Sequence, residues 1–403
     1  MSDLFIRPRY FRDVIFHRHT DRAIGWLELF YDLVYVATLI QIGNFLSDNL
    51  TLLGFGQFIV MMFVVWWAWT GETLYQNRFV ADDWLHRLLI FIQIAGVAVI
   101  GLSVSEAFGD LSVQFTVGYV MVRSIMIVLY IRTYVTHPES QAQSVNYMIG
   151  FGGGIAIWLG ALFIPAAYHW VAWLVAIAFE IVFFARSSLR PGPNPWSIDV
   201  HHGVERFGIF TIIVLGEAFV KVLDDAQGTA LALPQILFGI AGLVVLYAMW
   251  WLYFSDTADD TFDEVSANKT ISWGYGHLLL AVGLVSFGVA VKKLFSSTIS
   301  YAGEPVTEEY RLLFTVAIAL FLVALALIDY GINDDLTAKS QKVAALVHVV
   351  SAVAVVIAGL VFTGVTATGF VTIIAVIMVV QVGLSVYQEA AAPPPAEHYP
   401  ETT

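Results

Sequence analysis

A series of long apolar segments is the feature that most restricts how this chain folds. Roughly twelve segments reach the length of about 20 residues that a helix needs to cross a bilayer. A chain in lipid must satisfy its backbone hydrogen bonds internally, so only helices or a closed barrel are available. Barrel strands alternate over about ten positions, whereas the apolar run 343–378 is far longer. The pattern predicts an all-α, polytopic transmembrane bundle with segments at 26–46, 55–75, 85–105, 115–134, 146–164, 167–185, 204–223, 235–254, 272–292, 311–329, 344–363 and 366–386.

Composition excludes several classes of protein. Charged residues make up 13% of the chain and hydrophobic residues 59%, against about 25% charged in a soluble domain. The net charge of −13 argues against a nucleic-acid partner. Cysteine is absent, which excludes disulfides and thiolate metal sites. The expected partner is the lipid bilayer, and no motif predicts a bound cofactor.

A glycine run, Gly150–Gly154, could be mistaken for a phosphate-binding loop. It lies inside an apolar segment, and no Lys-Ser/Thr pair follows it. A phosphate loop needs a preceding strand and that lysine, whereas small residues let transmembrane helices approach closely. We therefore predict helix packing at this run.

Basic residues predict the orientation. With the N-terminus inside, the segments on the inner side contain most of the Lys and Arg, which is the usual bias of cytoplasmic loops. The outer segments hold only Lys221, Lys292, Lys293 and Arg311. We therefore expect a multi-pass protein of the plasma (inner) membrane with both termini in the cytoplasm.

The chain also suggests an internal duplication. A Pro- and Ser-rich linker near the middle separates two halves, and the double tryptophans of the two halves align. Glu72 and Asp256 then take the same repeat position. Six spans in each half would make the repeats parallel. The predicted organisation is a basic cytoplasmic segment 1–25, a six-helix repeat 26–186, a cytoplasmic linker 187–200, a second six-helix repeat 201–387 and a disordered cytoplasmic tail 388–403.

Two acidic residues occupy the first predicted helix. Glu28, Asp32 and Tyr35 are spaced i, i+4 and i+7, which places them on one helical stripe. Two carboxylates so close repel each other unless a proton or a cation intervenes. The stripe therefore predicts a proton site, a cation site or a structural cluster neutralised by arginine. Alternatively, Glu28 lies near the interface and pairs with Arg22 or another basic residue.

The seventh segment begins with a second group of ionisable residues. His201 and Glu205 are spaced i, i+4, at which two ligands can meet one metal. His201, His202 and Glu205 are thus weak metal-site candidates. Alternatively, the histidines lie among lipid headgroups, and Glu205 and Arg206 form ion pairs at the cytoplasmic interface.

Three further acids lie within or at the ends of apolar segments. Glu217 is surrounded by apolar residues and precedes Lys221 by four positions, the favourable order for a helical ion pair. Either that pair is structural, with Lys221 reaching outward, or Glu217 is functional because Gly216 beside it admits a helix or ligand. Glu72 and Asp256 follow aromatic runs, so they either mark the membrane boundary or, as repeat equivalents, contribute to a site.

At these residues the chain resembles the bacterial low temperature requirement A family. The stretch 26–37 followed by Gln41 is similar to the family's first signature, and 205–208 with 212–217 is similar to its second. Ala218 departs from the small polar serine expected there. The resemblance implies a bacterial or archaeal inner-membrane protein named for growth in the cold, without an established substrate. It marks Glu28, Asp32, Glu205, Arg206 and Glu217 as candidates.

Three functions remain open from the sequence. Duplicated helices with intramembrane acids favour a transporter or channel for a proton, cation or small polar solute. An intramembrane enzyme acting on lipid or another membrane substrate would use His201, His202 and Glu205, with or without a divalent metal. The nonspecific spacing of these residues makes an enzyme the less favoured interpretation. A structural or sensory protein of cold adaptation needs no buried acids.

Overall fold

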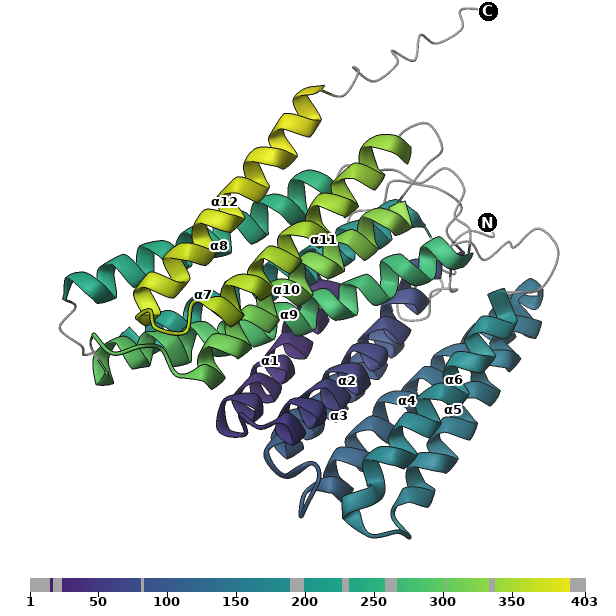
Figure 1. Cartoon of the computed structure of the whole chain (residues 1–403). Coiled ribbons are helices and arrows are strands. Elements are labelled where there is room, and N and C mark those ends of the chain that lie inside the picture. The colour runs from purple at the N-terminus through teal and green to yellow at the C-terminus, as the bar shows by residue number, and fades with distance from the viewer. Residues whose placement is uncertain are drawn as a thin grey trace, which may run out of the picture. The chain divides into compact units, whose positions relative to one another are not determined.

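A computed structural model describes residues 15–16, 24–80, 83–188, 199–226, 232–257, 267–301, 303–332 and 338–391. Twelve α-helices account for nearly all of these residues (Figure 1). A two-residue antiparallel pairing joins β1 (Ile15–Phe16) to β2 (Phe79–Val80). The predicted all-α bundle of about twelve helices is confirmed for the described part of the chain.

The helices belong to two compact units, the first of which comprises residues 1–225 and 284–293. In this unit α1 packs on α2 and α3, α3 on α4, α4 on α5, and α5 on α6. Its helices are α1 (Trp26–Asp48), α2 (Leu52–Arg78), α3 (Trp84–Ser103), α4 (Ser112–Thr136), α5 (Gln141–Ala161), α6 (His169–Ser188) and α7 (Val200–Ala226), with 3-10 turns η1 (Val104–Glu106), η2 (Pro138–Ser140) and η3 (Ala166–Tyr168).

The second unit comprises residues 226–283 and 294–403. Within it α10 packs on α11, α11 on α12, and α12 on α8. Its helices are α8 (Leu233–Thr257), both ends of α9 (Ala267–Ser300), α10 (Glu308–Ile332), α11 (Ala338–Val361) and α12 (Ala367–Ala391). These two units are defined by which helices pack together. The predicted duplication concerns whether residues 26–186 superpose on residues 201–387, and it stays a prediction.

Length and composition qualify ten of the described helices as membrane spans. The two others are α5 and α7. The α7 sequence carries histidines, acids and basic residues along its length, and α5 begins with a run of amide and hydroxyl side chains. The sequence predicted both helices as spans, like the other ten. Their polar residues explain why they do not qualify by composition as those ten helices do.

Short polar side chains fix the starts of several helices. Thr51 accepts a hydrogen bond from the Gly54 amide at 3.0 Å at the start of α2, and Asp83 accepts one from the His86 amide at 2.8 Å at the start of α3. Such caps satisfy backbone donors that have no partner inside the helix. They set where α2 and α3 begin, and thus the register of their polar residues.

Glycines allow α5 to lie directly against α6, as the sequence predicts for Gly150–Gly154. A Cβ atom on Gly150 would lie 3.0 Å from Phe183 Cβ, and one on Gly154 would lie 2.6 Å from Glu180 Oε1. Real Cβ atoms essentially never approach another atom as closely as 2.6 Å, and an approach of 3.0 Å is tighter than nine in ten real Cβ contacts. The run therefore serves helix packing, and Gly154 makes room for a buried carboxylate.

Candidate functional site

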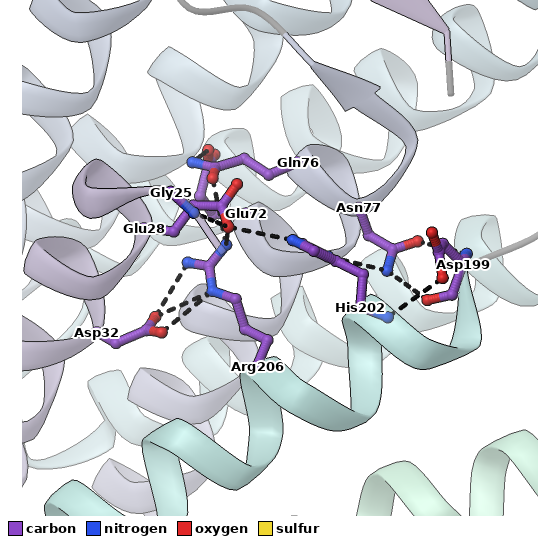
Figure 2. Close-up of polar contacts among 9 residues, drawn as sticks. All are labelled: Gly25, Glu28, Asp32, Glu72, Gln76, Asn77, Asp199, His202 and Arg206. Atoms are coloured by element: carbon purple, nitrogen blue, oxygen red, sulfur yellow. Dashed lines mark hydrogen bonds and ion pairs between the residues drawn. The ribbon is translucent and has the colours of Figure 1, made fainter. Parts of the chain in front are cut away.

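Helix α1 brings two acids into the interior of the first unit. Glu28 and Asp32 are one helical turn apart and are 2% and 0% exposed. The opposite stripe of the same turns carries Trp26, Phe30 and Leu33, which are exposed as a lipid-facing surface would be. The predicted acidic stripe is thus turned inward, toward α2 and α7 (Figure 2).

Arg206 of α7 is the counter-ion of Asp32. Its Nη2 lies 3.0 Å from Asp32 Oδ1, and its Nε lies 3.1 Å from Asp32 Oδ2. This is the two-pronged geometry in which a guanidinium binds a carboxylate most strongly. The indole N–H of Trp69 donates a further hydrogen bond of 2.7 Å to Asp32 Oδ1. Both members of the ion pair are 0% exposed, so Asp32 is held by three fixed donors.

A third acid, Glu72 of α2, joins the cluster through amides. It accepts hydrogen bonds from Gln76 Nε2 at 2.7 Å and from Gln93 Nε2 at 3.3 Å. Gln76 Oε1 accepts in turn from Arg206 Nη1 at 3.2 Å. Glu72 is 0% exposed, and within the described residues no cation lies at ion-pair distance from it. Gln76 therefore couples Glu72 to Arg206 without neutralising it.

Glu28 connects the cluster to the start of α7. His202 Nε2 lies 3.1 Å from Glu28 Oε2, and Arg206 Nη1 lies 3.9 Å from the same oxygen. The other ring nitrogen of His202, Nδ1, lies 3.4 Å from Asn77 Nδ2. Asn77 also exchanges two hydrogen bonds with the backbone of Asp199. The partner of Glu28 is thus a histidine, and the expected alternative partner Arg22 lies outside the described residues.

Three carboxylates, those of Glu28, Asp32 and Glu72, lie in this cluster. Arg206 forms ion pairs with Asp32 and Glu28, and His202 contacts Glu28, whereas the hydrogen bonds to Glu72 come from uncharged amides. A charge that is buried without an ion-pair partner is costly. The cluster is therefore chemically suited to hold a proton on one of its carboxylates. We call the set Glu28, Asp32, Glu72, His202 and Arg206 the acidic cluster.

The predicted metal candidates point in different directions. His201 Nε2 does meet Glu205 Oε1 at 3.3 Å, as the i, i+4 spacing predicts, but these side chains are 59% and 41% exposed. His202 faces the opposite way, into the acidic cluster. No group of three or more His, Asp or Glu side chains in the described part of the chain is arranged to hold a metal.

The other candidate acids lie apart from the acidic cluster. Glu217 and Lys221 line a cavity of about 10 Å³ between α1, α7 and the middle of α9, which is about the space one water needs. Lys221 is 8% exposed rather than reaching outward. Its Nζ occupies the space where Gly43 lacks a side chain, since a Cβ there would lie 2.6 Å away. The side chain of Asp256 lies outside the described residues.

Sequence reasoning missed a second buried ion pair. Arg123 Nη2 of α4 lies 2.9 Å from Glu180 Oε2 of α6, and both side chains are 0% exposed. Glu180 also accepts from Trp67 Nε1 at 2.8 Å, and Arg123 Nε donates to the Tyr119 hydroxyl at 3.0 Å. An arginine in the middle of an apolar segment was the available signal. Nothing in the spacing of the sequence pointed to Glu180 as its partner, because the two residues lie on different helices.

The second unit has its own buried polar group. His348 Nε2 of α11 lies 3.3 Å from Asp329 Oδ2 of α10. Gln381 of α12 contacts His348 Nδ1 at 2.9 Å and accepts a hydrogen bond from Ser351. His348 had no spacing signal in the sequence, because its partners Asp329 and Gln381 come from two other helices.

Comparison with known proteins identifies the family. The profile described as bacterial low temperature requirement A protein (LtrA) matches residues 23–382. The chain belongs to the LtrA family. An uncharacterized protein of Rhizobium meliloti (strain 1021) is similar to it, at 26% identity over 290 residues. That match covers 64% of this chain and 66% of the relative, just under two thirds of the relative's length.

LtrA membership and the apolar helices together make this a multi-pass membrane protein. The two segments that resemble the LtrA signatures are far apart in sequence, one on α1 and one on α7. They meet through Arg206, which binds Asp32 directly and approaches Glu28. Of the five signature candidates, the structure brings these three together and places Glu205 and Glu217 elsewhere.

Proposed function

We propose that this LtrA protein is a transporter or channel for a proton or a small cation, with the acidic cluster as the site that binds it. The observation that carries the proposal is Glu72, a fully buried carboxylate. Within the described residues its hydrogen bonds come from two uncharged amides rather than from a cation, and a buried charge without an ion-pair partner is costly.

Glu72 is the residue on which the proposal depends most. A charged acid inside a membrane costs about 2.5–3.5 kcal/mol on insertion scales. Glu72 accepts one amide hydrogen bond at each carboxylate oxygen, and neither donor carries a charge that would offset this cost. An acid in that place therefore favours a role in which the carboxylate gains and loses a proton or cation.

The connections of the cluster support movement of charge through it. Glu28 contacts His202 at one end, and an imidazole can accept a hydrogen bond at one ring nitrogen while it donates one at the other. Glu72 lies on the other side of Arg206, linked to it through Gln76. Protonation of one acid would release Arg206 toward another, which couples ion binding to the contact between α1 and α7.

No observation favours the enzymatic alternative to the same degree. An enzyme acting on lipid would need His201, His202 and Glu205 at one centre, and these side chains face different surroundings. A structural role remains the competing hypothesis, because buried ion pairs also fix helix packing.

We also propose that the protein resides in the inner membrane with both termini in the cytoplasm. The asymmetry of Lys and Arg between alternate loops supports this orientation. The start of α1, with Glu28, then lies toward the cytoplasm, and its end at Asp48 lies toward the exterior.

Flux in reconstituted vesicles tests the transport proposal. Vesicles loaded with a dye that responds to pH, to Na⁺ or to K⁺ would carry wild type, Glu72→Gln or Asp32→Asn, with the matching ion gradient imposed. Both variants should lose ion flux at least tenfold while keeping the wild-type elution profile in detergent. The control is Glu139→Gln, which removes a carboxylate that is 57% exposed.

Two results would contradict the proposal. Wild-type protein that passes no ion under any of the gradients would leave the structural role as the better hypothesis. Equal flux in wild type and Glu72→Gln would show that the buried acid is not part of an ion path.

A further inference from the structure

One face of α1 changes character half-way along the helix. Trp26, Phe30 and Leu33 form an exposed apolar stripe near its start. The same stripe continues at i+4 and i+3 spacing through Ala37 to Gln41, Asn44 and Asp48, and these four side chains are also exposed. The lipid-facing pattern of the first half is thus replaced by amides and a carboxylate.

This polar half lies within the span. Helix α1 ends at Asp48, and a rise of 1.5 Å per residue places Gln41 about 10 Å below that end. Lipid tails offer no hydrogen-bond partners, so exposed amides at such a depth need water, protein or a ligand beside them. Lipid is therefore not the expected neighbour of Gln41 and Asn44.

A groove accompanies the polar half of the helix. It has a volume of about 730 Å³ and is lined by α1 on one side and by α3 and η1 on the other. Its polar lining is Thr38, Gln41, Asn44, Asp48, Asn49, Ser105 and Glu106. The charged members, Asp48 and Glu106, are both acids, so the groove favours cations.

The groove closes toward the acidic cluster where α1 meets α3. Thr38 Oγ1 lies 3.4 Å from the carbonyl oxygen of Val97. A Cβ on Gly101 would lie only 3.1 Å from the same hydroxyl, so the two helices touch here. Asp32 lies six residues nearer the start of α1, about 9 Å from Thr38 along the helix axis, and on the inward stripe of that helix. Passage from the groove to the cluster therefore requires the contact between α1 and α3 to open.

We infer that this groove is a water-filled vestibule that concentrates cations and delivers them to the acidic cluster from the end of α1 opposite Glu28. The delivery step rests on the proposed transport function. The hydration of the vestibule is a separate property that is measurable without any flux.

The absence of cysteine from the chain makes a labelling experiment direct. Gln41→Cys and Asn44→Cys would be reconstituted and exposed to membrane-impermeant thiosulfonate reagents, one cationic and one anionic. Phe30→Cys and Leu33→Cys are matched controls, since they are exposed on the same stripe at 52% and 53%. The two vestibule cysteines should react at least tenfold faster than the controls.

The preference of the vestibule for cationic over anionic reagents is a second quantity to measure. The cationic reagent should modify Asn44→Cys about tenfold faster than the anionic reagent, because carboxylates in a cleft attract cations. Adding Asp48→Asn and Glu106→Gln should remove most of this preference while leaving the cysteine reactive. A preference that survives both substitutions would overturn the cation-attracting role.

The remaining outcomes separate the inference from its alternatives. Reaction no faster than at Leu33→Cys would overturn the vestibule. Cross-linking of Asn44→Cys between two copies under mild oxidation would also overturn it, because the polar face would then be an interface between subunits. Rapid labelling together with no flux under any gradient would uphold the hydrated vestibule and reject the transport function.

Discussion

Asp32 and Arg206 are 174 positions apart in the chain and form a fully buried, two-pronged ion pair, with 3.0 Å between Arg206 Nη2 and Asp32 Oδ1. The pair joins α1 to α7 and lies at the centre of the acidic cluster. Its guanidinium is also 3.9 Å from Glu28 and is bonded to Gln76. Arg206 is therefore the residue whose loss affects most of the cluster.

Replacing Arg206 should destabilise the protein strongly. Arg206→Gln leaves Asp32 and Glu28 buried without their guanidinium, and breaking a buried ion pair in this way costs about 3–5 kcal/mol. Arg206→Lys keeps the charge without the planar fork and should lose less. Thermal unfolding in detergent measures both, with the exposed Arg87→Gln as the control.

A double variant separates charge from packing. Adding Asp32→Asn to Arg206→Gln removes the uncompensated carboxylate, so the pair of substitutions should be more stable than Arg206→Gln alone. Equal instability of the single and double variants would show that Arg206 acts through packing rather than through Asp32.

Two glycines of α5 provide a matched test of the second ion pair. Gly154→Ala places a Cβ 2.6 Å from Glu180 Oε1 and should destabilise the protein by about 1–3 kcal/mol, as overpacking of an interior does. Gly152→Ala meets no atom within 4 Å and should be neutral or stabilising by up to about 1 kcal/mol. Unfolding temperatures of the two variants measure the difference, and equal values would contradict the packing assigned to Gly154.

The sequence was sufficient for the helices and for the inward stripe of α1. Apolar length predicts the spans because lipid thickness sets a nearly fixed helix length. The i, i+4 spacing places Glu28 and Asp32 on one face by helix geometry alone. Likewise, the missing Lys-Ser/Thr after Gly150–Gly154 correctly excluded a phosphate loop there.

The partners of these residues were beyond the reach of spacing. Periodicity reports the face on which a residue lies, but not which distant helix covers that face. The pairing of Arg123 with Glu180 crosses from α4 to α6, and that of Glu28 with His202 crosses from α1 to α7. A neighbour in sequence, such as Arg22 for Glu28, was therefore the natural choice of partner.

Asp83, in the turn between α2 and α3, should make the free energy of unfolding depend on pH. Burial by itself would raise the pKa of Asp83, but hydrogen bonds from Arg132 and from the His86 amide outweigh it and lower that pKa below its usual value. A lowered carboxylate pKa contributes stability that is complete above the unfolded pKa of about 3.9 and is lost as the pH falls through the folded pKa.

Asp83→Asn isolates this contribution, because asparagine still caps a helix. Wild type should be the more stable protein at neutral pH, and the difference should shrink as the pH falls below about 4 toward the folded pKa of Asp83. Unfolding temperatures in detergent from pH 3 to 7 measure the two curves. A difference that grows toward low pH would have the wrong sign for an ionised Asp83.

Glu217 provides the last prediction, which sets a pairing role against an ion-binding role. It lines the same water-sized cavity as Lys221. The Lys221 side chain is only 8% exposed. Glu217→Gln should therefore leave a buried ammonium without its nearby carboxylate and destabilise the protein by about 1–3 kcal/mol. Adding Lys221→Met removes that ammonium in an apolar shape, so the double variant should regain most of the stability. Thermal unfolding and ion flux per folded molecule measure the two roles in the same vesicle preparation. An unchanged unfolding temperature with lost flux would place Glu217 on the ion path instead, as its position in the second signature suggests.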